Sequence, residues 1–389
     1  MPDSEVLCYT FPHWHRTALN DRLYAPGWTE YRLMRGARPW FPGHHQPRTP
    51  ELGELDERQP ATWDVYDRLA ADAGITGFVF DWYWYEQRPA FHEALEEGYL
   101  SGERRTGFAV MWTNHTWYRQ LPTPGAPDVG DFQAMFGGTG QGARELQCEA
   151  PDDALEARRS LSYLVARYFH LPGYTRIDGR QLLVVWDAAR LLRLYGRDGT
   201  SGLVAWLRQR AADLGHPSIH LHANQAGMDA FGQLAECGFD SYGVYNPIYL
   251  AAAERPDSEE LTSYGDAVDD IIAHLWDRWD AMSELPFFPA IGPGWDSTPR
   301  FLQPSRPQTP SRRAWPGGEL VVGETSAEFG RLARAALARA DPGHHVVTIG
   351  SWNEWTEGQY LLPDTKHGQG MLRALGDAVR SARGGGRDG

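Results

Sequence analysis

The stretch ATWDVYDRLAADAGITGFVFDWYW, residues 61–84, contains the unit that predicts the fold of the whole chain. Its first part, 61–74, is typical of a helix, and its second part, 75–84, is a short, continuous apolar run. A run of this kind, rich in Val, Ile and Phe, is typical of a strand buried on both faces of a parallel sheet. The stretch therefore predicts one helix-and-strand repeat of an α/β fold.

Similar apolar runs recur along the chain, and most of them follow a helical stretch. The strand candidates are 5–11, 75–84, 106–112, 180–187, 217–224, 239–245, 285–296 and 344–355. Strands that alternate with helices imply right-handed crossovers and a parallel sheet. Eight such units at this length close into a (β/α)8 TIM barrel. The alternative is an open doubly wound sheet, but no GxGxxG motif follows the first run.

The same pattern predicts how the chain is divided. We expect a single catalytic domain over 1–380 and a disordered tail at 381–389. Three long loops, at 116–150, 246–264 and 296–325, follow strand ends and would overhang the site, since loops this long are usually functional.

Composition excludes several classes of function. The 389 residues carry a net charge of -14, which argues against nucleic acid and against anionic membrane surfaces. The three cysteines are scattered and form no disulfide or metal-type pattern. No apolar run approaches the ~20 residues of a membrane helix, and the start, MPDSEVLCYT, shows no signal peptide. These features predict a cytoplasmic protein with no membrane partner.

Aromatic residues are unusually frequent, with 16 Trp and 17 Tyr. Flat aromatic faces suit stacking on sugar rings, and their polar tips can form hydrogen bonds. For any single Trp, a place in the core is an equally good interpretation.

Polar side chains recur where the apolar runs end. They are Asp81, Asn114, His115, Asp187, Asn224, Asn246, Asp296, Asn353 and Glu354. In a barrel all strand C-termini open onto one face, so these side chains should converge there. The alternative for the Asp and Asn residues is a cap on the following helix.

The last run leads into SWNEWTEG, residues 351–358, in which Glu354 and Glu357 stand among indoles. Hydrolysis of a glycosidic bond usually takes two carboxyl groups, one that donates a proton and one that acts as nucleophile or base. Their pKa values must be pushed apart. On a helix surface such a pair would be only solvated, but this one follows a strand candidate, which favours a catalytic pair.

Several motifs resemble the glycoside hydrolases of family 99 and the family 99-like, WbsX-like proteins. The C-terminal motif is WNEWTEG followed by YLLPDTKHGQGML. Agreement continues in FPHWH (11–15), NDRLYAPGWTEY (20–31), PWFPGHHQPRTPELGELD (39–56), GITGFVFDWYWY (74–85) and FFPAIGPGWDSTPR (287–300). The resemblance spans nearly the whole chain.

The resemblance implies a retaining glycosidase that needs no cofactor and no metal for its chemistry. It implies that Glu354 is a base toward the 2-hydroxyl of the sugar, which closes to a 1,2-anhydro sugar. Glu357 would protonate the leaving oxygen and later activate water. A covalent glycosyl-enzyme on Glu354 is the alternative. His115 stands where many of the similar proteins have an acid, which leaves mannose specificity open.

A larger set of residues is expected to line the sugar subsites. It consists of His15, Glu30, His44, Asp81, Asn114, His115, Tyr245, Trp295, Asp296, Trp352 and Asn353, with Trp82, Trp84 and Trp117 as stacking surfaces. Three arginines of the seventh loop, Arg300, Arg312 and Arg313, would suit an acidic sugar, although a solvated loop is the simpler interpretation. Paired histidines, such as His220 and His222, suggest metal ligands, but the carboxylate pair already accounts for hydrolysis.

Two other functions remain open. A glycosyltransferase of cell-surface polysaccharide synthesis would need a nucleotide-sugar site, and transglycosylation by the same glutamates is a closer variant. A non-catalytic carbohydrate-binding barrel is the third possibility, although both glutamates are intact. The sequence does not indicate the sugar, the linkage or the oligomeric state.

Overall fold

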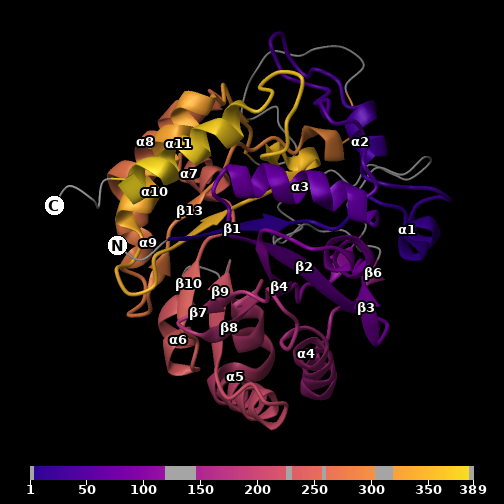
Figure 1. The fold of residues 1–389 in the computed structure, drawn as a ribbon, viewed down its shortest axis with the longest axis vertical. Coiled ribbons are helices and arrows are strands. Elements are labelled where there is room, and N and C mark those ends of the chain that lie inside the picture. Colours follow the sequence, from indigo (N-terminus) through magenta and orange to yellow (C-terminus); the bar gives the residue numbers. More distant parts are fainter. Residues whose placement is uncertain are drawn as a thin grey trace.

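The computed structural model describes residues 4–118, 146–224, 230–255, 260–301, 303 and 319–384. A mostly parallel sheet lies at the centre of the molecule and helices surround it (Figure 1). The barrel strands are β1 (Glu5–Thr10), β2 (Gly77–Tyr85), β4 (Gly107–Trp112), β8 (Arg180–Val185), β9 (Ile219–Asn224), β10 (Ser241–Gly243), β12 (Phe287–Phe288), β13 (Ala290–Ile291) and β15 (Val346–Ile349).

These strands pair in the order in which they occur along the chain. The order in the sheet is β12-β10-β9-β8-β4-β2-β1-β15-β13. β12 and β13 form its two ends, yet only Pro289 separates them in sequence, so this one segment nearly closes the barrel. All neighbours along this path are parallel. The predicted TIM barrel is therefore confirmed, and the open doubly wound sheet is not the fold.

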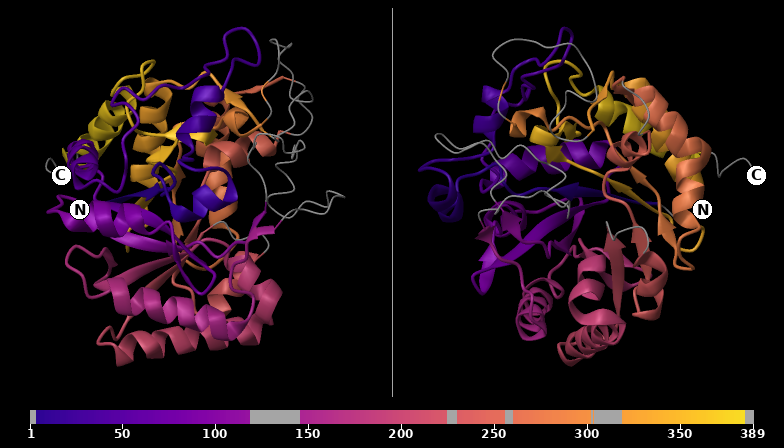
Figure 2. Two further views of the ribbon diagram at one scale, coloured as in Figure 1. Left: turned by 90° about the vertical axis from the view of Figure 1, so that its right-hand side faces the viewer. Right: turned by 180° about the vertical axis from the view of Figure 1, so that it is seen from behind.

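Helices surround the barrel strands and also lie over their C-terminal end (Figure 1). They are α1 (Ala18–Leu23), α2 (Tyr31–Gly36), α3 (Pro60–Asp72), α4 (Ala154–Tyr168), α5 (Ala188–Asp213), α6 (Phe231–Glu236), α7 (Pro247–Ala253), α8 (Tyr264–Asp270), α9 (Trp276–Asp280), α10 (Ser326–Arg339) and α11 (Gly370–Gly384). Figure 2 shows α4 and α5 on one side of the strands, and α8, α10 and α11 lie on the opposite side.

Short strand pairs form in the loops and at the ends of barrel strands. They are β3 (Arg88–Ala90) on β2, β7 (Arg176–Ile177) on β8, β5 (Trp117–Tyr118) with β6 (Leu146–Cys148), β11 (Thr262–Ser263) with β14 (Val321–Val322), and β16 (Asn353–Glu354) with β17 (Gln359–Tyr360). The last pair presents the Glu-x-x-Glu motif just beyond the end of β15.

Some expectations fall on residues outside the description. Much of the predicted loops at 116–150 and 296–325 lies there, with Arg312 and Arg313, and so does 256–259 of the third loop. The expected tail at 381–389 overlaps the end of α11, which extends to Gly384, and the rest of it lies outside the described residues. Within the described residues, no helix combines the length and the apolar character that crossing a bilayer requires.

Candidate active site

Carboxyl side chains and one guanidinium group meet at the C-terminal end of the barrel strands. Glu30 follows β1, Asp81 lies in β2, Arg300 follows β13, and Glu354 and Glu357 follow β15. All of them are buried. The barrel therefore brings together residues from the two ends of the chain.

Arg300 is the centre of this cluster. Its Nη1 donates to Oε1 of Glu357, and its Nη2 donates to Oε2 of Glu354 at 3.0 Å. The same Nη2 lies 3.4 Å from Oε1 of Glu30, and Nε donates to Oγ1 of Thr356 at 2.9 Å. Arg300 is thus not on a solvated loop, and the simpler interpretation of this residue was wrong. In the sequence Arg300 stands in a polar loop, and only the fold shows that its side chain points into the site.

The turn between the two glutamates fixes their relative positions. Residues Trp355–Glu357 form a single 3-10 turn, and Gly358 ends it with a φ of 64°. The carbonyl of Glu357 accepts from the backbone N–H of Asp296 at 2.6 Å. A Cβ at Gly358 would lie 2.9 Å from Asp296, so glycine satisfies both the close approach and the left-handed backbone.

Burial dominates the protonation of the pair. Burial raises the pKa of Glu354 well above its usual range, the negative charge of Glu357 raises it further, and Arg300 opposes both. Burial also raises the pKa of Glu357, again against Arg300. Because two carboxylates so close to each other repel, the pair favours holding one proton.

The other two carboxyl groups differ in charge. Burial raises the pKa of Glu30, but Arg300 and His13 outweigh it and lower that pKa to about 2. Burial and the nearby Glu357 raise the pKa of Asp81 well above its usual range, and its Oδ1 has no hydrogen-bond partner. The site therefore contains one permanent anion and one carboxyl group that favours the neutral, donating form.

Aromatic rings line this cluster. The guanidinium carbon of Arg300 lies 6.0 Å from the ring centre of Phe11. Tyr83 contacts Asp81 through its hydroxyl at 3.4 Å, and the ring of Tyr245 packs against Tyr9. The acids thus stand against ring faces and hydroxyls of the kind that suit a sugar.

A second polar network lies beside the cluster. Asp296 accepts hydrogen bonds from Gln46 at 2.7 Å and contacts His44 at 3.0 Å and Arg48 at 3.4 Å. Arg48 continues to Glu324, at 3.2 Å. His44 and Asp296 therefore support the loop that carries Glu357, which the backbone N–H of Asp296 holds through the Glu357 carbonyl.

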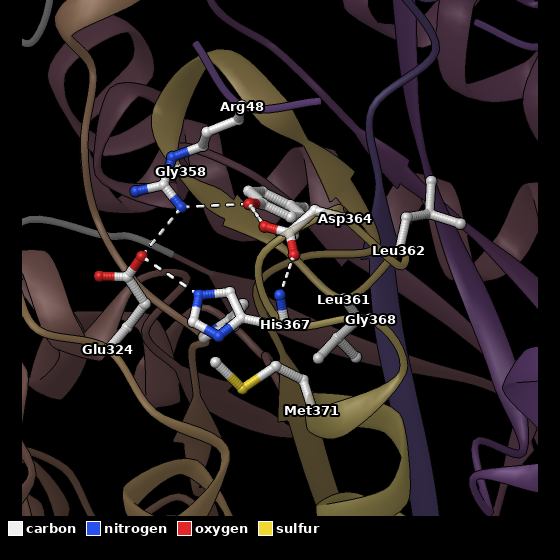
Figure 3. Close-up of a pocket in the computed structure, with 11 residues that line it drawn as sticks. Arg48, Glu324, Gly358, Leu361, Leu362, Asp364, His367, Gly368 and Met371 are labelled. Carbon is white, nitrogen blue, oxygen red and sulfur yellow. Dashed lines mark hydrogen bonds and ion pairs between the residues drawn. The ribbon is translucent and has the colours of Figure 1, made fainter. Parts of the chain in front are cut away.

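Figure 3 shows the far side of this network, where Arg48, Glu324 and His367 surround a small cavity. Its volume is about 10 Å³, which is room for about one water molecule and not for a sugar. We assign these side chains to holding three loops together.

Several predicted subsite residues face away from the cluster. Trp82 and Trp84 stand on the opposite face of β2 from Asp81 and contact Tyr163 of α4. Trp352 packs against Tyr66 and Phe78. Neighbouring residues of a strand alternate between its faces, so indoles next to an inward carboxyl turn outward.

Other predicted residues make structural contacts nearby. Asn353 bonds the backbone of Phe11, Asn114 bonds the backbone of Asp187, His15 faces Glu93, and Trp295 packs on Tyr249. His115 and Trp117 contact each other, with Trp117 Nε1 donating at 2.8 Å, and both rings contact Tyr83 beside Asp81. Burial, followed by the charge of Arg190, lowers the pKa of His115 to about 4, so it is neutral near pH 7.

Within the part of the chain that the structure describes, two clusters have metal-type ligands, His45 with Asp364 and His367, and Asp178 with His220 and His344. A cationic side chain lies beside each cluster. Lys366 and Arg48 pair with Glu324 beside the first, and Arg180 contacts His220 and Asp178 in the second. Neither cluster contacts the glutamates of the motif, so we assign no catalytic metal.

Sequence reasoning missed three parts of the site. Thr356 lies inside the motif and bonds Glu30, His13 contacts Glu30, and Glu57 accepts from Asn353. Thr356 could have been suspected from its place between the two acids. The partners of His13 and Glu57 are distant in sequence and carry no local signal.

Among solved structures, the chain is similar to the GH99 endo-alpha-mannosidase from Bacteroides thetaiotaomicron. The TM-score is 0.55 and the identity 14%, over 99% of this chain and 100% of that one. A structure described as a glycoside hydrolase-like protein has a TM-score of 0.58 at 12% identity, over 97% and 94% of the two chains. At these identities the likeness shows a shared fold.

Sequence relatives give the family. The uncharacterized protein WxcX of Xanthomonas campestris pv. campestris, in strains ATCC 33913 and B100, is 27% identical over 97% of this chain. The match covers 50% of that protein, so the chain spans about half the length of the curated relatives it matches. Residues 6–375 match the family described as Glycosyltransferase WbsX, and the chain therefore belongs to that family.

Proposed function

We propose that this chain is a glycoside hydrolase that cleaves a glycosidic bond in a polysaccharide or oligosaccharide with retention of configuration. One observation carries the proposal. Glu354 and Glu357 share a single buried guanidinium group at the C-terminal end of a (β/α)8 TIM barrel, where barrel enzymes hold their active sites.

The shared guanidinium group keeps the two carboxyl groups adjacent. Retention follows from the two-step reaction proposed here, because the anomeric carbon is inverted once in each step. In the proposed reaction Glu354 takes the proton of the sugar 2-hydroxyl, which attacks the anomeric carbon as Glu357 protonates the leaving oxygen. In the second step Glu357 takes a proton from water, which attacks the anomeric carbon and opens the 1,2-anhydro sugar, while Glu354 returns its proton to O2. Proximity of the hydroxyl to the reacting carbon would supply much of the acceleration.

The charges favour an uncharged sugar at the bond that is cleaved. Arg300 is already paired with three carboxylates, so a uronate would have to compete with them for the guanidinium group. Glu30 is a fixed anion close by. A substrate carboxylate would meet repulsion here, whereas sugar hydroxyls would satisfy the unpaired Oδ1 of Asp81.

The experiment is a panel of neutral mannans, uronate-containing polysaccharides and aryl glycosides, with products followed by mass spectrometry and the anomer by NMR. Glu357→Gln should lose at least about 100-fold in kcat on unactivated substrates, the scale of general acid catalysis. The loss should be smaller on aryl glycosides with good leaving groups. Glu103→Gln, on an exposed glutamate, is the matched control. Equal cleavage by the wild type and Glu357→Gln would disprove the assignment.

A second candidate is transfer of a glycosyl group by the same glutamates, which the description of the family favours. Here an acceptor hydroxyl would replace water in the second step. Adding oligosaccharide acceptors to the assay separates the two functions, because transfer yields products longer than the substrate. Turnover only with a nucleotide sugar would indicate a glycosyltransferase.

A further inference from the structure

Arg300 forms ion pairs with three of the four carboxyl groups in the cluster, and Asp81 is the one outside this set. The side chain of Arg300 is 8% exposed, and three carboxylates surround it through Nη1 and Nη2. Nε adds the hydroxyl of Thr356. A guanidinium group with this many partners has its direction fixed by the protein.

The charges around Arg300 do not balance. Three carboxylates face one guanidinium group, so full ionisation would leave an excess of two negative charges in a buried place. An unpaired buried charge costs several kcal/mol, so the cluster retains a proton. Glu30 bonds to Thr356 and contacts His13, which leaves the proton to Glu354 or Glu357.

The position of the guanidinium group determines which of the two glutamates holds the proton. In this structure Nη1 donates to Glu357, whereas Nη2 is shared between Glu354 and Glu30, which favours the anion on Glu357 and places the proton on Glu354. The proposed hydrolysis needs the reverse, a protonated Glu357 and an ionised Glu354. The guanidinium group must therefore release Glu357 and keep Glu354 when a sugar binds.

We propose that Arg300 is a positioning residue that decides which of Glu354 and Glu357 holds their shared proton, and that Glu30 and Thr356 set its place. This inference rests on the proposed function for its consequence in catalysis. Thr356 suits the task because its hydroxyl accepts from Arg300 Nε and donates to Glu30 Oε2 at 2.7 Å. The residue between the two glutamates thereby ties the motif to its counter-ion.

Two charge-removing variants test the inference through opposite shifts of pH dependence. Arg300→Gln removes the cation and should raise the pKa of both glutamates, moving both limbs of the kcat/KM profile up by about 1–3 pH units. Glu30→Gln removes a competing anion and should move both limbs to lower pH. Glu93→Gln, outside the cluster, should leave the profile unchanged. Shifts in the same direction, or none, would overturn the inference.

A second readout needs no substrate. The infrared band of protonated carboxyl groups can be titrated in the free protein, with Glu354→Gln and Glu357→Gln identifying each contribution. We expect the band to disappear at higher pH in Arg300→Gln and at lower pH in Glu30→Gln. If the band shifts as expected but no substrate is hydrolysed, the role of Arg300 is upheld and the proposed function is rejected. If substrate is hydrolysed but the band does not shift, the proposed function is upheld and the role of Arg300 is rejected.

Because Arg300 is buried, a milder pair of variants keeps the test valid even where Arg300→Gln does not fold. Thr356→Val keeps the shape of the side chain and removes its hydroxyl, whereas Thr356→Ser keeps the hydroxyl. The infrared midpoint should change in Thr356→Val and stay at the wild-type value in Thr356→Ser. An unchanged midpoint in both Thr356→Val and Glu30→Gln would overturn the inference whether or not Arg300→Gln folds.

Discussion

Glu57 is a buried carboxyl group directly behind the motif. Its Oε1 accepts from Nδ2 of Asn353 at 2.7 Å, and its Oε2 has no hydrogen-bond partner. Asn353 also bonds the N–H and the carbonyl of Phe11, so it joins the end of β1 to β16. Glu57 therefore supports the strand that carries Glu354 without touching the reacting groups.

The charge state of Glu57 makes stability depend on pH. Burial raises its pKa from 4.5 to about 8. A carboxyl group with a raised pKa in the folded state stabilises the fold fully below the unfolded pKa, and this contribution is lost as pH rises through the folded pKa. Glu57→Gln imitates the neutral acid and does not titrate.

We expect Glu57→Gln to gain stability relative to the wild type as pH rises from about 4.5 to 8. The gain should be on the order of 5 kcal/mol, since each pKa unit corresponds to about 1.4 kcal/mol. Urea unfolding at several pH values measures it. A difference that stays constant with pH would show that Glu57 is ionised in the folded protein.

At the scale of elements, α5 contains a break that one glycine makes possible. Gly196 has a φ of 64° and a ψ of -176° inside the range Ala188–Asp213. The first part of α5 begins at Ala188, directly after Asp187, whose side chain caps it, and the second part buries Leu203 and Leu207. Only glycine adopts this backbone conformation readily.

Two alanine substitutions in α5 separate backbone strain from loss of space. A Cβ at Gly196 or at Gly202 would meet nothing within 4 Å, so neither side chain would clash. Gly196→Ala should destabilise the protein by about 1–3 kcal/mol because of its backbone. Gly202→Ala lies in regular helix and should stabilise it by about 0.5–1 kcal/mol. Equal unfolding free energies in urea for the two variants would contradict this account.

The strands and helices were largely predictable from the sequence, but the side of the sheet to which each side chain points was not. All predicted strands contain a barrel strand, because parallel strands buried on both faces are continuous apolar runs. The same feature conceals which side chains point inward, as no polar alternation marks the faces. Asp81 was expected to line the site together with Trp82 and Trp84, yet the two indoles contact α4.

At the scale of the whole molecule, the site exists only because the barrel closes. Glu30, Arg300 and Glu354 come from loops after three different strands, and adjacent strands β1, β13 and β15 bring them together. The motif itself was recognisable because its two acids are three residues apart. Arg300 was not, because nothing near it in sequence indicates three carboxylate partners from distant segments.

The barrel also connects distant helices, which bears on whether residues 1–380 form one domain. We propose that they do. α11 packs along α10 and also contacts α3, whereas α5 lies on the opposite side of the strands (Figure 1). Leu375 of α11 is 1% exposed, so Leu375→Ala should cost about 2–5 kcal/mol.

If residues 1–380 unfold as one cooperative unit, the stability lost in Leu375→Ala must be lost by every strand equally. Hydrogen exchange should show the amides of β8, far from α11, losing the same protection free energy as those of β15, which lies near α10. Arg373→Ala, at an exposed position on the same helix, should change protection by less than about 0.5 kcal/mol. If β15 loses protection while β8 keeps it, the two halves of the barrel unfold separately and the single-domain proposal fails.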